Sequence, residues 1–210
     1  MTKRTIILVG FAAAALLAAG IAWQMGLFTK VSDIGNCVDV VAQIGMDPAH
    51  AVAVCRRQAN EGDAIAQADL GKMYAEGRGV AQDLNQARHW FQLAADQGQP
   101  DGQYDLGVMY AVGEGVPQDF VQAVKWYSLA AERGQTDAQN SLGMRYKRGE
   151  GVAQDYVQAH KWFALSAANA TQLPDRARAI ANRDAIAKLM TPAQIAEAER
   201  LARAWSPVAP

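Results

Sequence analysis

The chain has 210 residues, 50% of them hydrophobic, and a formal net charge of −1. This length accommodates one domain with additional segments. Because the net charge is close to zero, no overall field attracts nucleic acid, and we expect no nucleic-acid partner. Alanine is prominent, and few segments have the β-branched and aromatic enrichment of strands, so the composition favours closely packed helices.

The beginning of the chain differs from the rest. Lys3 and Arg4 precede an uncharged stretch, residues 5–23, that is rich in alanine, leucine and isoleucine. This pattern predicts a signal peptide or an N-terminal membrane anchor over residues 1–30. The length of the uncharged run favours an uncleaved anchor, whereas residues 20–22 provide a small-x-small cleavage site. The rest of the chain is expected in the cell envelope, facing the periplasm from the inner membrane, or periplasmic or secreted after cleavage.

The chain has two cysteines, Cys37 and Cys55. Outside the cytoplasm a cysteine pair indicates a disulfide rather than a metal site. Residues 33–45 and 48–61 are predicted to form two short helices, and an antiparallel hairpin would place the two cysteines opposite each other. We expect a bridge that contributes roughly 3 kcal/mol to stability. Two separate buried thiols are the alternative.

The next three stretches share one pattern at an interval of 36 residues. Each has a helical apolar stripe, a Gly-x-Gly turn, an aspartate and a second helical stripe with an aromatic pair. A period of this size predicts a solenoid of helical hairpins over residues 63–98, 99–134 and 135–170. The residues that recur are Leu70, Gly71, Tyr74, Gly77, Gly79, Asp83 and Trp90; Leu106, Gly107, Tyr110, Gly113, Gly115, Asp119 and Trp126; and Leu142, Gly143, Tyr146, Gly149, Gly151, Asp155 and Trp162.

Three of the recurring residues have a predicted local role. In the first repeat, Gly77 is expected to be a left-handed C-cap. Asp83 is expected to cap the second helix, with Gln86 completing a capping box. Gly71 lies within a helix, where glycine costs about 1 kcal/mol relative to alanine. We infer that the two helices approach too closely there for a Cβ atom, and that an aromatic pair of the same or an adjacent repeat fills the space.

This pattern resembles the Sel1-like repeat family, a relative of the tetratricopeptide repeats. The motif is Leu-Gly-x-x-Tyr, Gly-x-Gly-Val, Asp, Ala-x-x-Trp-Phe/Tyr, Ala-Ala and Gly, and it covers residues 63–170 almost completely. The resemblance implies an all-α fold, a right-handed α–α superhelix with the first helices on its concave side. It also implies an adaptor that binds another protein or a peptide, because members of the family look like adaptors with very different partners.

The segments that flank the repeats are predicted to cap the solenoid. The repeat period places residues 31–62 as a degenerate helical hairpin, because Asp47 then corresponds to Asp83. Residues 171–205 are expected to form C-terminal capping helices, over 174–190 and 192–204. Residues 206–210 are expected to be a disordered tail.

No group of residues in the sequence indicates catalysis. The histidines, His50, His89 and His160, are not gathered with carboxylates or cysteines at ligand spacing, so we expect solvated surface roles and no metal. The repeated aspartates are explained as helix caps rather than as a catalytic row. The repeated tryptophans are explained as core rather than as a ligand-stacking ladder. We expect no catalytic residues and no cofactor.

Residues that differ between the repeats predict where a partner binds. They lie on one face of each first helix, and the resemblance places that face in the concave groove. An apolar centre and a basic end would suit an extended or helical peptide with some acidic residues. The alternative is an inter-repeat or convex face. The residues are Ala68 and Lys72; Tyr104, Val108 and Val112; and Asn140, Met144, Lys147 and Arg148.

The sequence thus predicts a non-catalytic scaffold for protein–protein interactions in the bacterial cell envelope. The alternatives are an envelope hydrolase or cell-wall-modifying enzyme with a composite site in the groove, and a secreted effector. An enzyme would need a convergent acid/base set, and the sequence shows none.

Overall fold

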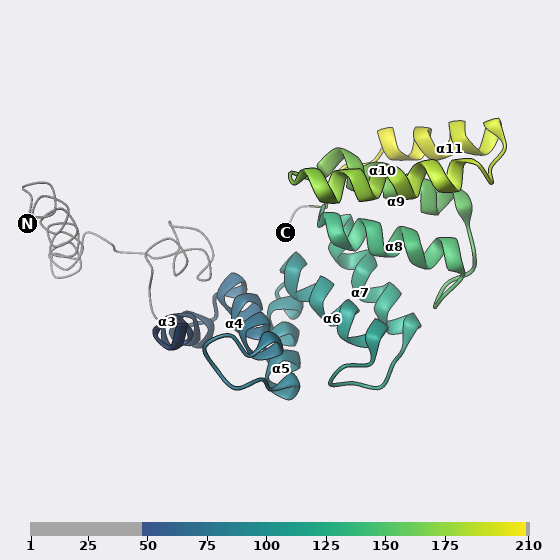
Figure 1. Cartoon of the computed structure of the whole chain (residues 1–210). Helices are drawn as coiled ribbons and strands as arrows, with labels where there is room; N and C mark the ends of the chain where they lie inside the picture. The colour runs from purple at the N-terminus through teal and green to yellow at the C-terminus, as the bar shows by residue number, and fades with distance from the viewer. Residues whose placement is uncertain (1–47, 209–210) are drawn as a thin grey trace, which may run out of the picture.

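The described part of the chain is a curved stack of antiparallel helices (Figure 1). The computed structural model describes residues 48–208, and every regular element within them is a helix. The prediction of an all-α helical-repeat solenoid is confirmed. The helices are α3 (Pro48–Asn60), α4 (Ala64–Glu76), α5 (Leu84–Asp96), α6 (Pro100–Val112), α7 (Phe120–Glu132), α8 (Thr136–Arg148), α9 (Tyr156–Asn169), α10 (Leu173–Ala187) and α11 (Pro192–Arg203).

Each repeat forms one hairpin, and we call its first helix the A helix (α4, α6, α8) and its second the B helix (α5, α7, α9). Each A helix packs most extensively on its own B helix, and each B helix then packs on the following helix of the chain. Helix α10 packs on α9 and touches α8, which is the position of a further A helix. Helix α11 packs on α9, and α3 packs on α4 at the other end.

The turn between the A and B helices is closed in the same way in every repeat. Gly77 ends α4 in the left-handed conformation, with φ of 71°, as predicted. Asp83 caps α5 by accepting from the backbone N–H groups of Asn85 and Gln86 at 2.9 and 3.0 Å. Within residues 48–208 the reciprocal capping box forms at Thr191–Gln194 rather than at the repeated aspartates. Instead, the glutamine before each capping aspartate donates to a carbonyl at the end of the A helix.

The glycine inside each A helix lies against a ring of its own B helix, which confirms the predicted close approach. A Cβ atom on Gly107 would lie 2.6 Å from ring carbons of Tyr127, and the other two repeats show the same with Phe91 and Phe163. These rings are buried. The ring is therefore the second member of the aromatic pair of the same repeat. The first member of the pair packs toward the preceding helices: Trp90 contacts the core between α3 and α4.

A buried glutamine near the start of each A helix joins it to the preceding helix. Gln67, Gln103 and Gln139 donate to the carbonyls of Ala59, Ala95 and Ala131, at 3.1 to 3.3 Å. In the first and third repeats the glutamine oxygen accepts from a side chain that follows or ends the B helix. In the second, Arg133 occupies that position and donates to Leu129, and the Gln103 oxygen has no hydrogen-bond partner. Sequence reasoning had assigned these glutamines no role.

Predictions for the N-terminal part fall largely outside the described residues. These are the signal or anchor over 1–30, the helix over 33–45 and Cys37. Cys55 of α3 is fully buried in a core with Ala51 and Leu70. The bridge to Cys37 therefore stays a prediction.

The C-terminal segment is attached to the solenoid as far as it is described. Trp205 packs against the core formed by α6 to α9. The backbone N–H of Val208 donates to the carbonyl of Glu132 at 2.8 Å, at the end of α7. Residues 206–208 are exposed and belong to no regular element, so the disordered tail stays a prediction. Residues 209–210 lie outside the described part.

Candidate partner-binding face

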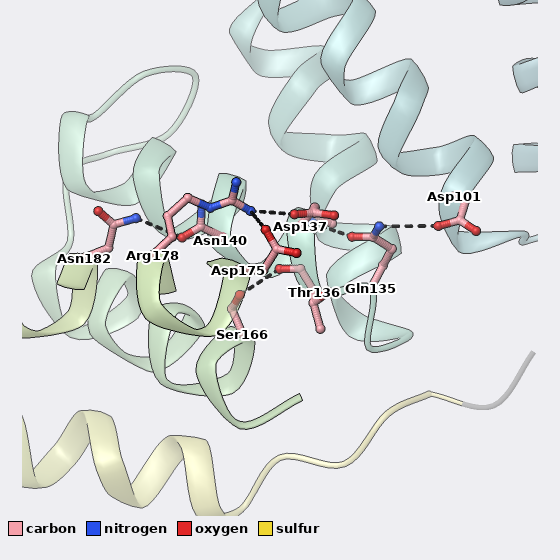
Figure 2. A network of polar contacts seen from close by, with 10 residues as sticks. Asp101, Gln135, Thr136, Asp137, Asn140, Ser166, Asp175, Arg178 and Asn182 are labelled. Carbon is pink, nitrogen blue, oxygen red and sulfur yellow. Dashed lines mark hydrogen bonds and ion pairs between the residues drawn. The ribbon is translucent and has the colours of Figure 1, made fainter. Parts of the chain in front are cut away.

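The first column of predicted groove residues lies at contacts between repeats. Ala68 is 1% exposed, so the prediction that its side chain meets a partner is wrong. Tyr104 packs on Tyr127 of its own hairpin, with ring centroids 5.8 Å apart, and its phenol hydrogen-bonds Ser141 of α8. Asn140 accepts a hydrogen bond of 2.9 Å from Asn182 of α10 (Figure 2). Tyr104 and Asn140 follow the inter-repeat alternative, because the next hairpin and the cap contact them.

The second column is also partly covered. Lys72 of α4 forms an ion pair with Asp105 of α6, with Nζ 3.7 Å from Oδ2. Val108 packs against the core of α6 to α9, and Met144 packs against the core around Phe163. Lys72 keeps a side-chain exposure of 33%, so it is the most polar accessible part of this column.

The C-terminal ends of the A helices remain open to solvent. Val112 is 57% exposed and the side chain of Arg148 is 52% exposed. Glu76 is exposed and Lys147 is half-buried. We define the A-helix face as the accessible side chains in the C-terminal halves of the A helices: Lys72 and Glu76, Val108 and Val112, and Lys147 and Arg148.

Charged residues at the ends of the A-helix face form ion pairs with the turns that follow the A helices. Glu76 pairs with Arg78 at 2.5 Å, and Arg148 lies 3.8 Å from Glu150. Arg145 also pairs with Glu150 and lies over the Phe120 ring at 5.0 Å. Because these pairs are largely exposed, they weakly restrain Glu76 and Arg148, and both can exchange partners.

A row of carboxylates near the start of the A helices is a feature that sequence reasoning missed. Asp101 accepts from Gln135 of the next repeat, and Asp137 accepts from Arg178 of α10 at 2.7 Å (Figure 2). These bonds join repeat 2 to repeat 3 and repeat 3 to the cap. The signal was present in the repeat alignment, since Asp101 and Asp137 share one column.

Asp105 lies one turn after Asp101 in α6 and has an unusual protonation equilibrium. Burial raises the pKa of Asp105 to about 7, against a lowering effect of Lys72. Burial also disfavours the charge of Lys72, but the surrounding carboxylates, Asp105 first, outweigh it, so the pKa of Lys72 lies above its usual value. Lys72 therefore stays charged around neutral pH, whereas the charge of Asp105 changes with pH in that range.

The two histidines whose side chains the structure describes have different surroundings. His89 contacts Trp90 edge to face, with ring centroids 5.2 Å apart. His160 is 4% exposed, so its predicted surface role is wrong, and burial lowers its pKa. The side chain of His50 lies outside the described part. Among the described residues, no group of three or more histidine, cysteine or acidic side chains is placed to hold a metal ion.

The architecture defines the class of protein. A stack of hairpins at a fixed period, with one helix of each hairpin partly open to solvent, is an α-solenoid repeat protein. The Sel1 repeat family model matches residues 64–99, 100–135 and 136–170. The chain belongs to the Sel1 repeat family. Proteins of this family are in general scaffolds for protein–protein interactions and typically non-catalytic.

Solved structures with the same repeat are similar to this chain. A Sel1 repeat protein from Oxalobacter formigenes is 37% identical, with a TM-score of 0.54, over 61% of this chain and 96% of that one. The protein c5321, a protective antigen of uropathogenic Escherichia coli strains displaying an SLR fold, is 22% identical, with a TM-score of 0.41, over 84% of this chain and 62% of that one. No curated protein matches this chain.

Between residues 48 and 208, no helix combines the length and the apolarity needed to cross a bilayer. The predicted anchor lies in residues 1–30, outside this range.

Proposed function

We propose that this chain is a non-catalytic scaffold that binds a partner protein or peptide on the A-helix face. One observation carries the proposal: the ends of the A helices differ between repeats that otherwise share their frame, and these ends stay accessible. The face offers Lys72 and Glu76 in repeat 1, two valines in repeat 2, and Lys147 and Arg148 in repeat 3. A constant frame with variable accessible residues is what a repeat protein uses to present a binding surface.

The side chains define the kind of partner. Val112 at the centre would contact an apolar residue of the partner. Its side chain is exposed in the single chain, so its apolar area can be buried on binding. Arg148 and Lys147 at one end would pair with carboxylates. The partner segment that fits is extended or helical and carries an apolar residue with acidic neighbours. Such a segment would cross the C-terminal ends of successive A helices.

A matched pair of variants tests this proposal. Val112 and Val121 are both exposed valines near a helix end, at 57% and 63%, but Val121 lies in the first turn of the B helix α7. We expect Val112→Asn to weaken binding of the purified partner about tenfold, because it removes the burial of one valine side chain. Titration calorimetry would measure the dissociation constant.

Val121→Asn should bind like the wild type, and both variants should keep the wild-type melting temperature because neither valine is in the core. Equal loss of affinity in the two variants would place the partner elsewhere. A melting temperature lowered in Val112→Asn alone would identify Val112 as a structural residue.

We further propose that the chain acts in the cell envelope, through a signal or anchor over residues 1–30. The support is Lys3 and Arg4 followed by the uncharged apolar run, and the two cysteines beyond it. Intact mass measurement after fractionation of the producing cells tests both features. We expect the protein in the envelope fraction, with a mass lower by the two hydrogens lost in a Cys37–Cys55 bridge. A full-length, reduced protein in the cytoplasmic fraction would contradict it.

A further inference from the structure

One carboxyl oxygen lies at the contact between repeats 1 and 2 without a hydrogen-bond donor. Asp105 Oδ2 of α6 is buried and has no hydrogen-bond partner. Lys72 Nζ of α4 lies 3.7 Å from it, which is the distance of an ion pair but longer than a hydrogen bond. Because α4 and α6 belong to consecutive hairpins and contact each other, this pair spans a joint of the solenoid.

The charged groups around the pair are mainly acidic. Asp69 and Glu76 from α4 and Asp101 from α6 all act on the Lys72 ammonium together with Asp105. Glu76 and Asp101 also act on Asp105. Tyr104 of α6 and Tyr127 of α7 interact with Asp105, and burial raises the pKa of both phenols, so they stay neutral around neutral pH. Ionised Asp105 is therefore held between one cation and several like charges.

We propose that this contact is a proton-controlled joint: uptake of a proton by Asp105 ends its ion pair with Lys72 and makes the Lys72 ammonium available to an acidic group of a bound partner. The partner half of this inference rests on the proposed function of the A-helix face. The joint itself does not, since it involves only the contact between α4 and α6. Repeat 3 carries Ser141 at the position of Asp105, so the equivalent contact between α6 and α8 lacks this carboxyl group.

The inference gives the A-helix face a pH dependence of defined sign. Burial places the pKa of Asp105 at about 7, so the carboxyl is mostly neutral below that pH and ionised above it. Loss of one negative charge next to Lys72 makes the face more positive. An acidic segment should therefore bind more tightly below neutral pH than above it, and by linkage a bound acidic segment should raise the proton affinity of Asp105.

Carbon-13 NMR of the full chain with labelled aspartate carboxyl groups tests the joint without a partner. We expect one carboxyl resonance to titrate with a midpoint near pH 7 and to be absent in Asp105→Asn. The nitrogen-15 resonance of Lys72 Nζ should shift with the same midpoint. A midpoint for Asp105 below about pH 5, near the ordinary value of an aspartate, would overturn the proposal. So would a Lys72 resonance that stays constant while Asp105 titrates.

Two further variants separate the ion pair from general effects. Lys72→Met should move the Asp105 midpoint upward, because the cation that lowers it is gone. Asp137→Asn is the matched control, since Asp137 lies on the same side of the next A helix but pairs with Arg178. It should leave the midpoint unchanged. Because these resonances are read without a partner, loss of partner binding in Val112→Asn would bear on the proposed function alone.

Discussion

Replacing Gly107 with alanine is expected to destabilise the protein by roughly 2–3 kcal/mol. In an ordinary helix interior this change stabilises by about 1 kcal/mol, so the expected effect has the opposite sign. The reason is local: a Cβ atom there would lie 2.6 Å from Tyr127 Cδ1 and Cε1. The Tyr127 ring is 3% exposed and packed in the core, so it has no free space to move into. Urea denaturation followed by circular dichroism would measure the difference.

A double-mutant cycle identifies the cause of this loss. Tyr127→Leu alone should also destabilise the protein, because it leaves a gap in the core. Combined with Gly107→Ala it should cost less than the two single changes together, since the alanine then meets no ring. A Gly107→Ala variant as stable as the wild type would show that α6 and α7 are further apart than the structure has them.

Replacing Asp105 with asparagine is expected to change stability in a pH-dependent way. The unfolding free energy of the variant, relative to that of the wild type, should be higher at pH 8 than at pH 5 by on the order of 2–4 kcal/mol. The folded-state pKa of Asp105, about 7, lies above the ordinary value of 3.8. The folded protein thus holds this proton more tightly than the unfolded chain, and its stability falls as pH rises from about 4 to about 7. Asparagine has no proton to lose, so the variant should lack this decline.

Denaturation of both proteins at several pH values would measure the effect, with Asp137→Asn as the control. Asp137 is partly exposed and paired with Arg178, so that variant should be no more stable than the wild type at pH 8. If the stability difference between Asp105→Asn and the wild type were the same at pH 5 and pH 8, the carboxyl would not be titrating in this range.

Local sequence patterns predicted the hairpin and its internal contacts well. Leu70 and its counterparts are core, the repeated aspartates cap the B helices, and the mid-helix glycines meet an aromatic ring. These features depend on residues close in sequence or on the two helices of one hairpin. Helical periodicity and capping chemistry therefore contain the information needed.

The predicted binding face was less accurate, and the error has a geometric cause. Periodicity shows that Ala68, Tyr104 and Asn140 share one side of the A helices, but not whether that side meets solvent or the next hairpin. This depends on the rotation between successive hairpins, which no local pattern encodes. Asn140 also meets α10, which does not follow the repeat spacing, so no column of the repeats predicted Asn182 as its partner.

Long-range electrostatics was the other feature that the sequence did not reveal. Lys72 and Asp105 lie in different repeats, and neither is unusual in its own helix. Their pairing depends on the contact between α4 and α6, and the raised pKa of Asp105 depends on burial at that contact. The sequence identifies Asp105 as one acid among several, and the structure distinguishes it.

Photo-crosslinking in the producing cells tests the central claim most directly. A photoreactive amino acid at position 112 would sample the A-helix face, and the same residue at position 121 would sample the B helix α7. We predict that position 112 crosslinks one defined protein at a segment with an apolar residue and acidic neighbours, and that position 121 does not. Crosslinking of the same partner from position 121, with none from position 112, would contradict partner binding on the A-helix face.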